Sequence, residues 1–178
     1  FAEQRYGFRP KRGCKDALRR VDQLLKTGHV YVVDADLKGY FDTIPHDRLM
    51  MRLTEKIADG PVLSLIESFL KANILDGLEE WAPTTGAPQG AVLSPLLSNI
   101  YLDPLDHLVA RSGVALVRYA DAFVILCRTP ADASRALEPV REWVLANRLT
   151  LPPTNAPVAA PLTGGCDSTG PHIPRGPR

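Results

Sequence analysis

Cysteine is scarce in this sequence, and it has no long apolar run. Its 178 residues include three cysteines, Cys14, Cys127 and Cys166, which are far apart and lack the paired spacing of a zinc site. An odd, scattered set predicts neither a disulfide framework nor a structural metal. No run reaches the roughly 18 apolar residues of a membrane helix, and the first thirty residues contain no apolar stretch that would suit a signal peptide. We therefore expect a cytoplasmic protein with no membrane partner.

A starting methionine is also missing, since the chain begins at Phe1. We expect an internal segment whose natural beginning lies upstream. The composition is that of a globular protein with one core, because 45% of the residues are hydrophobic and 23% are charged. The net charge is only +1, but residues 1–26 hold eight Lys and Arg against three acids. That local excess suits phosphate binding, and it equally suits an ordinary solvated helix face.

The pattern of apolar residues predicts an alternation of helices and strands. The expected elements are a helix over 16–26, a buried strand over 29–36, helices near 47–57 and 61–72, irregular or hairpin structure over 81–88, a helix over 93–109, a β-hairpin over 114–127 and a helix over 133–144. Pro104 is expected to kink or end the helix that contains it. The order is that of an α+β fold. It brings Asp36 to the end of a strand and Asp121 to the tip of a hairpin.

Four segments together resemble the reverse transcriptases of group II introns. Asp36-Leu-Lys-Gly-Tyr-Phe-Asp-Thr-Ile44 looks like the first polymerase palm motif, and the run from Gly86-Ala-Pro-Gln-Gly90 to Leu102 looks like the second. Tyr119-Ala-Asp-Ala122 is similar to the third, and Tyr6-Gly-Phe-Arg-Pro10 to the segment that precedes the palm. Each string alone would be weak, but their order and spacing match the family over about residues 5–151.

The resemblance implies the fold and the domain organisation. We expect a truncated right-hand polymerase, in which a palm-like antiparallel sheet carries helices on one face and the catalytic residues on the other. Residues 1–151 would be the reverse transcriptase domain, comprising the end of the fingers and the palm. Residues 152–178 hold seven prolines and four glycines in 27 positions, a share that predicts a degenerate tail with little regular structure.

The resemblance also implies a two-metal site. Joining a primer 3′-hydroxyl to a dNTP uses Mg²⁺ ions to favour the nucleophile and to hold the triphosphate, and Mg²⁺ takes oxygen ligands. By resemblance, Asp36 and Asp121 are catalytic metal ligands, and the carbonyl of Leu37 joins them. Taken alone, an aspartate at a strand end would be a turn or cap residue.

Four more residues are implied to bind substrate. Phe41 occupies the family position of a steric gate against a ribose 2′-hydroxyl, although an aromatic there also suits a core. Gln89 matches the residue that contacts the incoming nucleotide, although a bare Pro-Gln-Gly tripeptide indicates only a turn. Arg9 and Arg12 could reach phosphates of template or nucleotide, or be ordinary surface residues.

The sequence departs from the family at one ligand and throughout its end. Ala122 stands where active relatives have a second aspartate, which removes a carboxylate from the ion site. Asn155 stands at a position that is usually lysine and cannot act as a cationic acid, and the segment from Gly164 to His172 has lost the aromatic residues of a family hairpin. The region of the thumb and the triphosphate-binding part of the fingers are missing from the sequence.

We therefore expect an RNA-directed DNA polymerase of group II intron type whose activity is impaired or lost. The implied cofactor is Mg²⁺ at a weakened two-metal site, and the implied partners are an RNA template, a DNA primer, dNTP and intron RNA. One alternative is a noncatalytic nucleic-acid-binding remnant, which would bind RNA without extending a primer. A second is a nucleotidyl cyclase, which also uses a palm with paired carboxylates, although the Phe41 position and the Pro-Gln-Gly segment argue against it.

Overall fold

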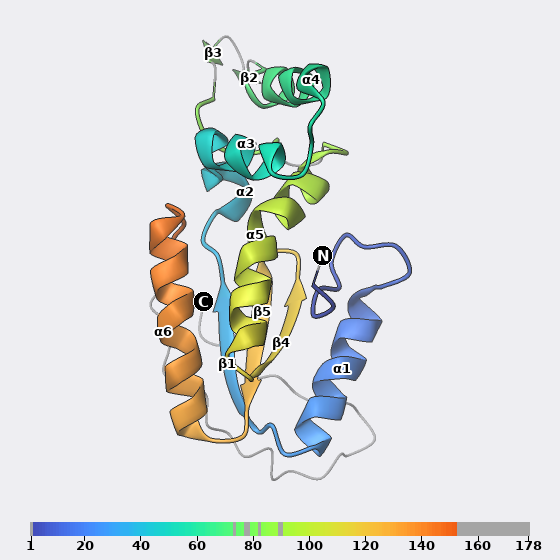
Figure 1. Ribbon diagram of the computed structural model, residues 1–178, viewed down its shortest axis with the longest axis vertical. Helices are drawn as coiled ribbons and strands as arrows, with labels where there is room; N and C mark the ends of the chain where they lie inside the picture. The colour runs from blue at the N-terminus through green and yellow to red at the C-terminus, as the bar shows by residue number, and fades with distance from the viewer. Residues whose placement is uncertain (1, 73, 77–78, 82, 89–90, 153–178) are drawn as a thin grey trace.

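A three-stranded antiparallel sheet forms the centre of the molecule (Figure 1). The computed structural model describes residues 2–152 apart from 73, 77–78, 82 and 89–90. β1 (Tyr31–Asp36) and β4 (Ala115–Tyr119) are the outer strands, and β5 (Ala122–Cys127) lies between them. β4 and β5 form the predicted hairpin. The prediction of an α+β fold with a palm-like antiparallel sheet is confirmed.

Two long helices cover one face of the sheet, α5 (Ser94–Arg111) and α6 (Pro130–Ala146). Alternate residues of each strand point to this face, and they join the helices in one apolar cluster. The strand residues in the cluster are Val33, Ala35, Leu116, Phe123, Ile125 and Cys127. Pro104 lies inside α5, which continues to Arg111, so this proline does not end the helix.

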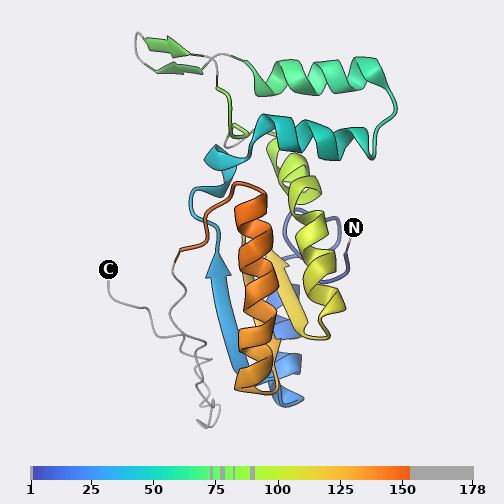
Figure 2. The ribbon, with the colours of Figure 1, turned by 60° about the vertical axis from the view of Figure 1, so that its left-hand side comes forward.

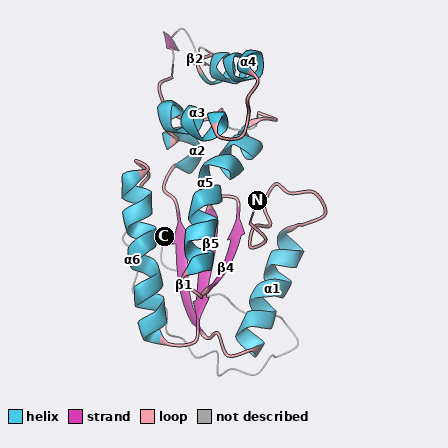
Figure 3. Ribbon diagram, viewed as in Figure 1, coloured by secondary structure: helices cyan, strands magenta, loops and turns pink. Residues whose placement is uncertain are grey.

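Among the described residues, the opposite face is covered only in part. α1 (Cys14–Lys26) lies against β4 and β5, where Ala17 and Leu24 pack with Val117 and Leu126 (Figure 3). The far end of the same face carries Asp36, which is exposed. The helix-covered face that the sequence predicts is therefore the one that packs against α5 and α6. α1 covers part of the second face as well, and among the described residues it leaves the Asp36 end exposed.

Between β1 and α5 the chain builds a helical extension at one end of the molecule (Figure 2). Its elements are α2 (Tyr40–Thr43), α3 (His46–Thr54), α4 (Gly60–Leu70) and the short strands β2 (Ile74–Asp76) and β3 (Glu79–Trp81). Asp59 caps α4 by accepting a hydrogen bond from the Val62 amide at 3.0 Å, and Pro61 lies in the first turn, where its missing N–H is tolerated. The two helices expected after Asp36 are confirmed.

The N-terminal segment continues the sheet beyond β4. The Tyr6 amide donates to the Arg118 carbonyl at 2.8 Å, and the Arg118 amide donates to the Gln4 carbonyl at 3.0 Å. Residues 4–6 thus run parallel to β4 and satisfy backbone groups that an edge strand would leave unpaired. The Tyr6 to Pro10 motif is thereby brought beside the hairpin.

None of the helices in the described part of the chain combines the length and the hydropathy that crossing a bilayer requires. The predicted degenerate tail, residues 152–178, lies outside the described residues from 153 onward. Its lack of regular structure stays a prediction from composition.

Candidate active site

Asp36 and the hairpin tip lie side by side at one end of the sheet. Asp36 is the last residue of β1 and is paired directly with Ala122, the first residue of β5. Ala122 is in turn paired with Tyr119, the last residue of β4. Residues opposite one another in antiparallel strands point to the same face, with Cβ atoms about 4.5–5.5 Å apart. All three side chains are exposed on the open end of the face that α1 partly covers.

A two-residue turn presents Asp121. Tyr119 and Ala122 close the turn, so Ala120 and Asp121 are its central residues. Ala120 has a φ of 57°, a left-handed conformation that favours glycine. Strain of this kind persists only where the surroundings hold the backbone in place, and it gathers at functional sites.

The electrostatics of Asp121 indicate that the two aspartates share one environment. Burial raises the pKa of the Asp121 carboxyl, and the nearby charge of Asp36 raises it further. A backbone hydrogen bond and the charge of Arg118 act in the opposite direction. A divalent cation bound between a half-buried carboxylate and a second one would relieve the repulsion between their negative charges.

The site offers a divalent ion fewer carboxylate ligands than the palm of an active relative would. Within the described ranges, no cluster of three or more His, Cys, Asp or Glu side chains could hold a metal ion. Asp36 and Asp121 supply two carboxylates, and Mg²⁺ sites in proteins commonly use one or two together with water and substrate phosphates. Ala122 contributes no oxygen to this end of the sheet, although its position directly faces Asp36. The side chain of Leu37 is buried in the core, and its expected role involves only its carbonyl.

Phe41 lies in an aromatic group beside this site. Its ring packs edge-on against Tyr40 and Phe8, with centroids 5.5 Å and 6.5 Å apart. The Ala87 amide donates to the Phe41 carbonyl at 2.7 Å, so the start of the second motif lies against the first. Gln89, two residues further on, falls outside the described residues.

Arg9 and Arg12 both bind within the N-terminal loop. Arg9 Nη1 donates to the Ala2 carbonyl at 3.0 Å. Arg12 Nη1 donates to the Glu3 carbonyl, and the Arg12 guanidinium lies 5.3 Å from the centre of the Tyr6 ring. Each guanidinium has five N–H donors, so these contacts do not exhaust its capacity for phosphate. No contact of either arginine links it to Asp36 or Asp121 in the described residues.

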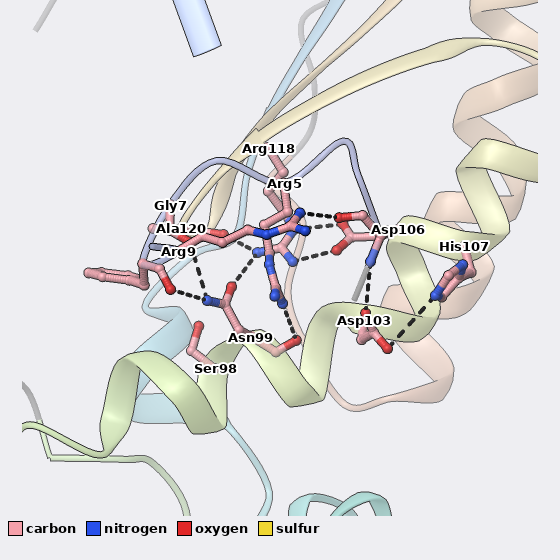
Figure 4. A network of polar contacts seen from close by, with 12 residues as sticks. Arg5, Gly7, Arg9, Ser98, Asn99, Asp103, Asp106, His107, Arg118 and Ala120 are labelled. Atoms are coloured by element: carbon pink, nitrogen blue, oxygen red, sulfur yellow. Dashed lines mark hydrogen bonds and ion pairs between the residues drawn. The ribbon is translucent and has the colours of Figure 1, made fainter. Parts of the chain in front are cut away.

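The sequence prediction missed a buried polar network behind the hairpin tip. It joins Arg118 of β4 to Asn99 and Asp106 of α5 and to the N-terminal segment (Figure 4). The sequence feature that could have indicated this network is a charged residue within an apolar segment. Arg118 directly follows the apolar run Val114 to Val117, and Asp106 lies in a largely apolar helix. Buried charged residues of this kind are rare unless they are paired.

The arrangement is the palm of a right-hand polymerase: a three-stranded antiparallel sheet backed by two helices, with aspartates on β1 and on the β4–β5 turn. Residues 1–155 match the family described as reverse transcriptase (RNA-dependent DNA polymerase). The chain belongs to this family, and it is similar to proteins encoded by group II introns.

Three relatives illustrate the similarity. The group II intron-encoded protein LtrA of Lactococcus lactis subsp. cremoris is 41% identical over 109 residues, which cover 61% of this chain and 18% of LtrA. Protein YkfC of Escherichia coli is 32% identical over 193 aligned positions, covering 85% of this chain and 51% of YkfC. A protein in the cob intron of Schizosaccharomyces pombe is 39% identical over 109 residues. The matched region therefore spans less than a fifth of the length of LtrA and about half the length of YkfC.

Solved structures support the fold alone. A telomerase from Candida albicans, determined with a fragment of telomeric RNA, superimposes with a TM-score of 0.67 over 84% of this chain and 31% of its own, at 12% identity. An apo telomerase from Candida tropicalis gives a TM-score of 0.62, also at 12% identity.

Proposed function

We propose that this chain is the palm-containing part of an RNA-directed DNA polymerase of group II intron type, with its activity impaired. The observation that carries the proposal is the placement of Asp36 at the end of β1 beside the turn that presents Asp121. Such a pair of carboxylates on the open end of a palm sheet suits nucleotidyl transfer, in which a primer 3′-hydroxyl attacks a dNTP and pyrophosphate leaves.

In this proposal the carboxylates of Asp36 and Asp121, together with the carbonyl of Leu37, would hold Mg²⁺. Such ions would supply positive charge to the attacking hydroxyl oxygen and to the triphosphate. The protein's part is to fix one carboxylate at the end of β1 and the other on the adjacent β4–β5 turn before substrate arrives. Because the pKa of Asp121 is raised by burial and by Asp36, a proton competes with the ion for this carboxylate.

The substrate contacts are also proposals. Phe41 would exclude a ribose 2′-hydroxyl, and its contacts with Tyr40 and Phe8 would hold the ring in place. Gln89 would contact the incoming nucleotide, and Arg9 and Arg12 would contact phosphates. The RNA template, DNA primer and intron RNA would be the partners, and residues 1–151 the reverse transcriptase domain.

Ala122 supports the proposal that the polymerase activity is impaired. A carboxylate at position 122 would face Asp36 across the strand pair, and its loss leaves fewer ligands for two cations. Loss of the groups that merely support metal ligands costs roughly 10–100-fold, so loss of a ligand itself should cost at least as much. A chain that keeps the palm surface but not the chemistry is the second candidate function, a noncatalytic nucleic-acid-binding protein.

A chimeric enzyme tests the proposal. Residues 5–151 would replace the corresponding segment of a full-length relative such as LtrA, so that the fingers and thumb are restored. We expect the Ala122→Asp chimera to extend a DNA primer on an RNA template, and the unchanged chimera to be more than about 100-fold slower. Asp36→Asn in the Ala122→Asp chimera should abolish extension.

The natural chain provides the complementary measurement. We expect it to show little or no primer extension with Mg²⁺ or Mn²⁺. Processive synthesis by the purified 178-residue chain would contradict the impaired form of the proposal. An Ala122→Asp chimera that folds and binds template and primer but stays inactive would contradict the polymerase assignment. Template binding without extension would favour the noncatalytic candidate.

A further inference from the structure

Arg118 and Asp106 form an ion pair that is completely buried. Arg118 Nε donates to Asp106 Oδ1 at 2.7 Å, and Nη2 donates to Oδ2 at 2.5 Å. Both side chains have 0% exposure. Burying such a pair is costly, and apolar replacements are often neutral or stabilising. Stability alone is therefore a weak reason for this pair, and its remaining contacts are informative.

The third nitrogen of Arg118 reaches the hairpin tip. Nη1 donates to the carbonyl of Ala120 at 2.6 Å and to Asn99 Oδ1 at 3.3 Å. Ala120 is the first residue of the turn that presents Asp121, and its φ of 57° is unfavourable for a residue with a Cβ atom. The guanidinium fork thus holds a strained backbone position one residue before the carboxylate.

The N-terminal segment closes on the same turn from the other side. Asn99 Nδ2 donates to the carbonyls of Gly7 and Phe8 at 3.2 Å and 3.4 Å. A Cβ atom on Gly7 would lie 2.3 Å from the Ala120 amide nitrogen, so the two backbones are in direct contact. Figure 4 shows Asn99 between Arg118 and Gly7, with Ala120 beside them.

We propose that Arg118 is a positioning residue for Asp121. Anchored by Asp106 on α5, it fixes the Ala120 carbonyl and thereby the direction in which the turn presents the Asp121 carboxylate, while Asn99 locks Gly7 against the same turn. This inference rests on the proposed ion-binding role of Asp36 and Asp121. Residues that hydrogen-bond to metal ligands or to their backbone commonly act in this way, and their loss costs about 10–100-fold in metal affinity.

Mn²⁺ binding to the intact chain tests the inference, with paramagnetic broadening of amide signals as the readout. In the natural protein we expect broadening on both sides of the site, near Asp36 and near Asp121. Arg118→Lys keeps the charge but loses the forked contact, so broadening on both sides of the site should require higher Mn²⁺ concentrations, because Asp36 and the hairpin are direct neighbours. The Mn²⁺ affinity should fall about tenfold or more.

Two further variants keep the test decisive if Arg118→Lys fails to fold. Asn99→Ala removes the link to Gly7 and one acceptor of Arg118, and it should give a smaller loss of the same kind. The double variant Arg118→Met with Asp106→Leu removes both buried charges at once, so it should fold and still bind Mn²⁺ weakly. In both, the order parameters of Ala120 and Asp121 in the metal-free chain should fall from about 0.85 toward 0.6.

Tyr101→Phe is the matched control. It also removes a buried hydrogen bond from α5, the one from the Tyr101 hydroxyl to the Asn147 carbonyl at 2.8 Å, but this bond does not touch the turn. Its Mn²⁺ affinity should stay within about twofold of the natural chain, a much smaller change than the roughly 10–100-fold expected when a residue that supports a metal ligand is lost.

The inference is overturned if the Arg118 and Asn99 variants that fold keep natural Mn²⁺ affinity and an ordered turn while Asp121→Asn lowers the affinity. If Asp36→Asn and Asp121→Asn also leave the affinity unchanged, the proposed function itself fails at the ion site. The two failures are therefore distinguishable.

Discussion

His46 Nε2 lies 2.7 Å from the carbonyl oxygen of Gly86, and this contact joins the start of α3 to the second palm motif. His46 is buried at the start of α3. The Gly86 amide donates in return to the Ile44 carbonyl at 2.8 Å. Gly86 has a φ of 91°, and a Cβ atom there would lie 3.0 Å from the Asp42 carbonyl oxygen. α2, which carries Phe41, is thus fixed against the loop that leads toward Gln89.

Replacing His46 should therefore destabilise the fold. His46→Ala leaves the Gly86 carbonyl without its buried partner, and we expect a loss of about 1–3 kcal/mol in the free energy of unfolding. Urea denaturation followed by circular dichroism measures it. The matched control is His107→Ala, because His107 is largely exposed and exposed substitutions usually change stability by less than about 0.5 kcal/mol. Equal effects of the two substitutions would contradict the role given to the His46 contact.

Gly7→Ala should also be destabilising, for a steric reason. The added methyl group would meet the backbone of Ala120 at 2.3 Å, and the neighbouring turn cannot rotate away as a side chain can. Overpacking of this kind costs about 1–3 kcal/mol. Gly60→Ala is the control, because nothing lies within 4 Å of its Cβ position, and it should be neutral or slightly stabilising. If chemical denaturation gave the two variants the same stability, Gly7 would not be in close contact with the turn.

Ala122→Asp should strengthen divalent-ion binding in the otherwise natural chain. The new carboxylate would face Asp36 across the strand pair and adjoin Asp121, adding an oxygen ligand of the kind that Mn²⁺ and Mg²⁺ take. Paramagnetic broadening of signals near Asp36 measures the affinity. Ala122→Asn, which has the same shape without the charge, should give a much smaller gain. No change in affinity for either Ala122→Asp or Asp36→Ala would show that no ion site is assembled here.

The contribution of Asp121 to stability should fall with rising pH. Its pKa in the folded state is raised, first by burial and then by Asp36. The contribution of its protonated form is fully present below the unfolded pKa of about 3.9 and is lost as pH rises through the folded pKa. Asp121→Asn should therefore match the natural chain near pH 3.5 and become the more stable of the two at pH 7.

Asp16 provides a control of opposite sign for that pH series. Its pKa is lowered, chiefly by the hydrogen bond from the Gly13 amide. The stability it contributes is present above the unfolded pKa and is lost as pH falls through the folded pKa. Urea unfolding of Asp16→Asn should therefore show its deficit at neutral pH. A deficit for Asp121→Asn at pH 7 would overturn the assignment of a raised pKa.

The sequence could predict the elements and the two aspartates because both follow from local patterns. The apolar run before Asp36 predicts a buried strand, and two β-rich runs around Tyr119 to Ala122 predict a hairpin with Asp121 at its tip. The turn was predicted even though Ala120 occupies a position that usually takes glycine. Family spacing supplied the order of the motifs.

The buried network could not be predicted in the same way, because its members are brought together only by tertiary packing. Asp106 and Arg118 are 12 residues apart, while Asn99 and Gly7 are separated by 92. The cover of α1 on the second face depends on which side of the sheet an amphipathic helix reaches, and periodicity does not specify that side. Of the two effects expected of Pro104, ending the helix is the one the structure contradicts, because α5 continues to Arg111.

The pairing of Asp36 with Ala122 also bears on how such a chain persists under selection. Like charges directly opposite each other on neighbouring strands destabilise a sheet, so an intact site weakens the metal-free protein for the sake of catalysis. Alanine at position 122 relieves that conflict between activity and stability. A descendant that no longer synthesises DNA would unfold less often and meet cellular proteases less often. If alanine at position 122 disables the enzyme, as proposed, the same substitution would prolong the lifetime of its scaffold, leaving a folded surface on which a different binding function can evolve.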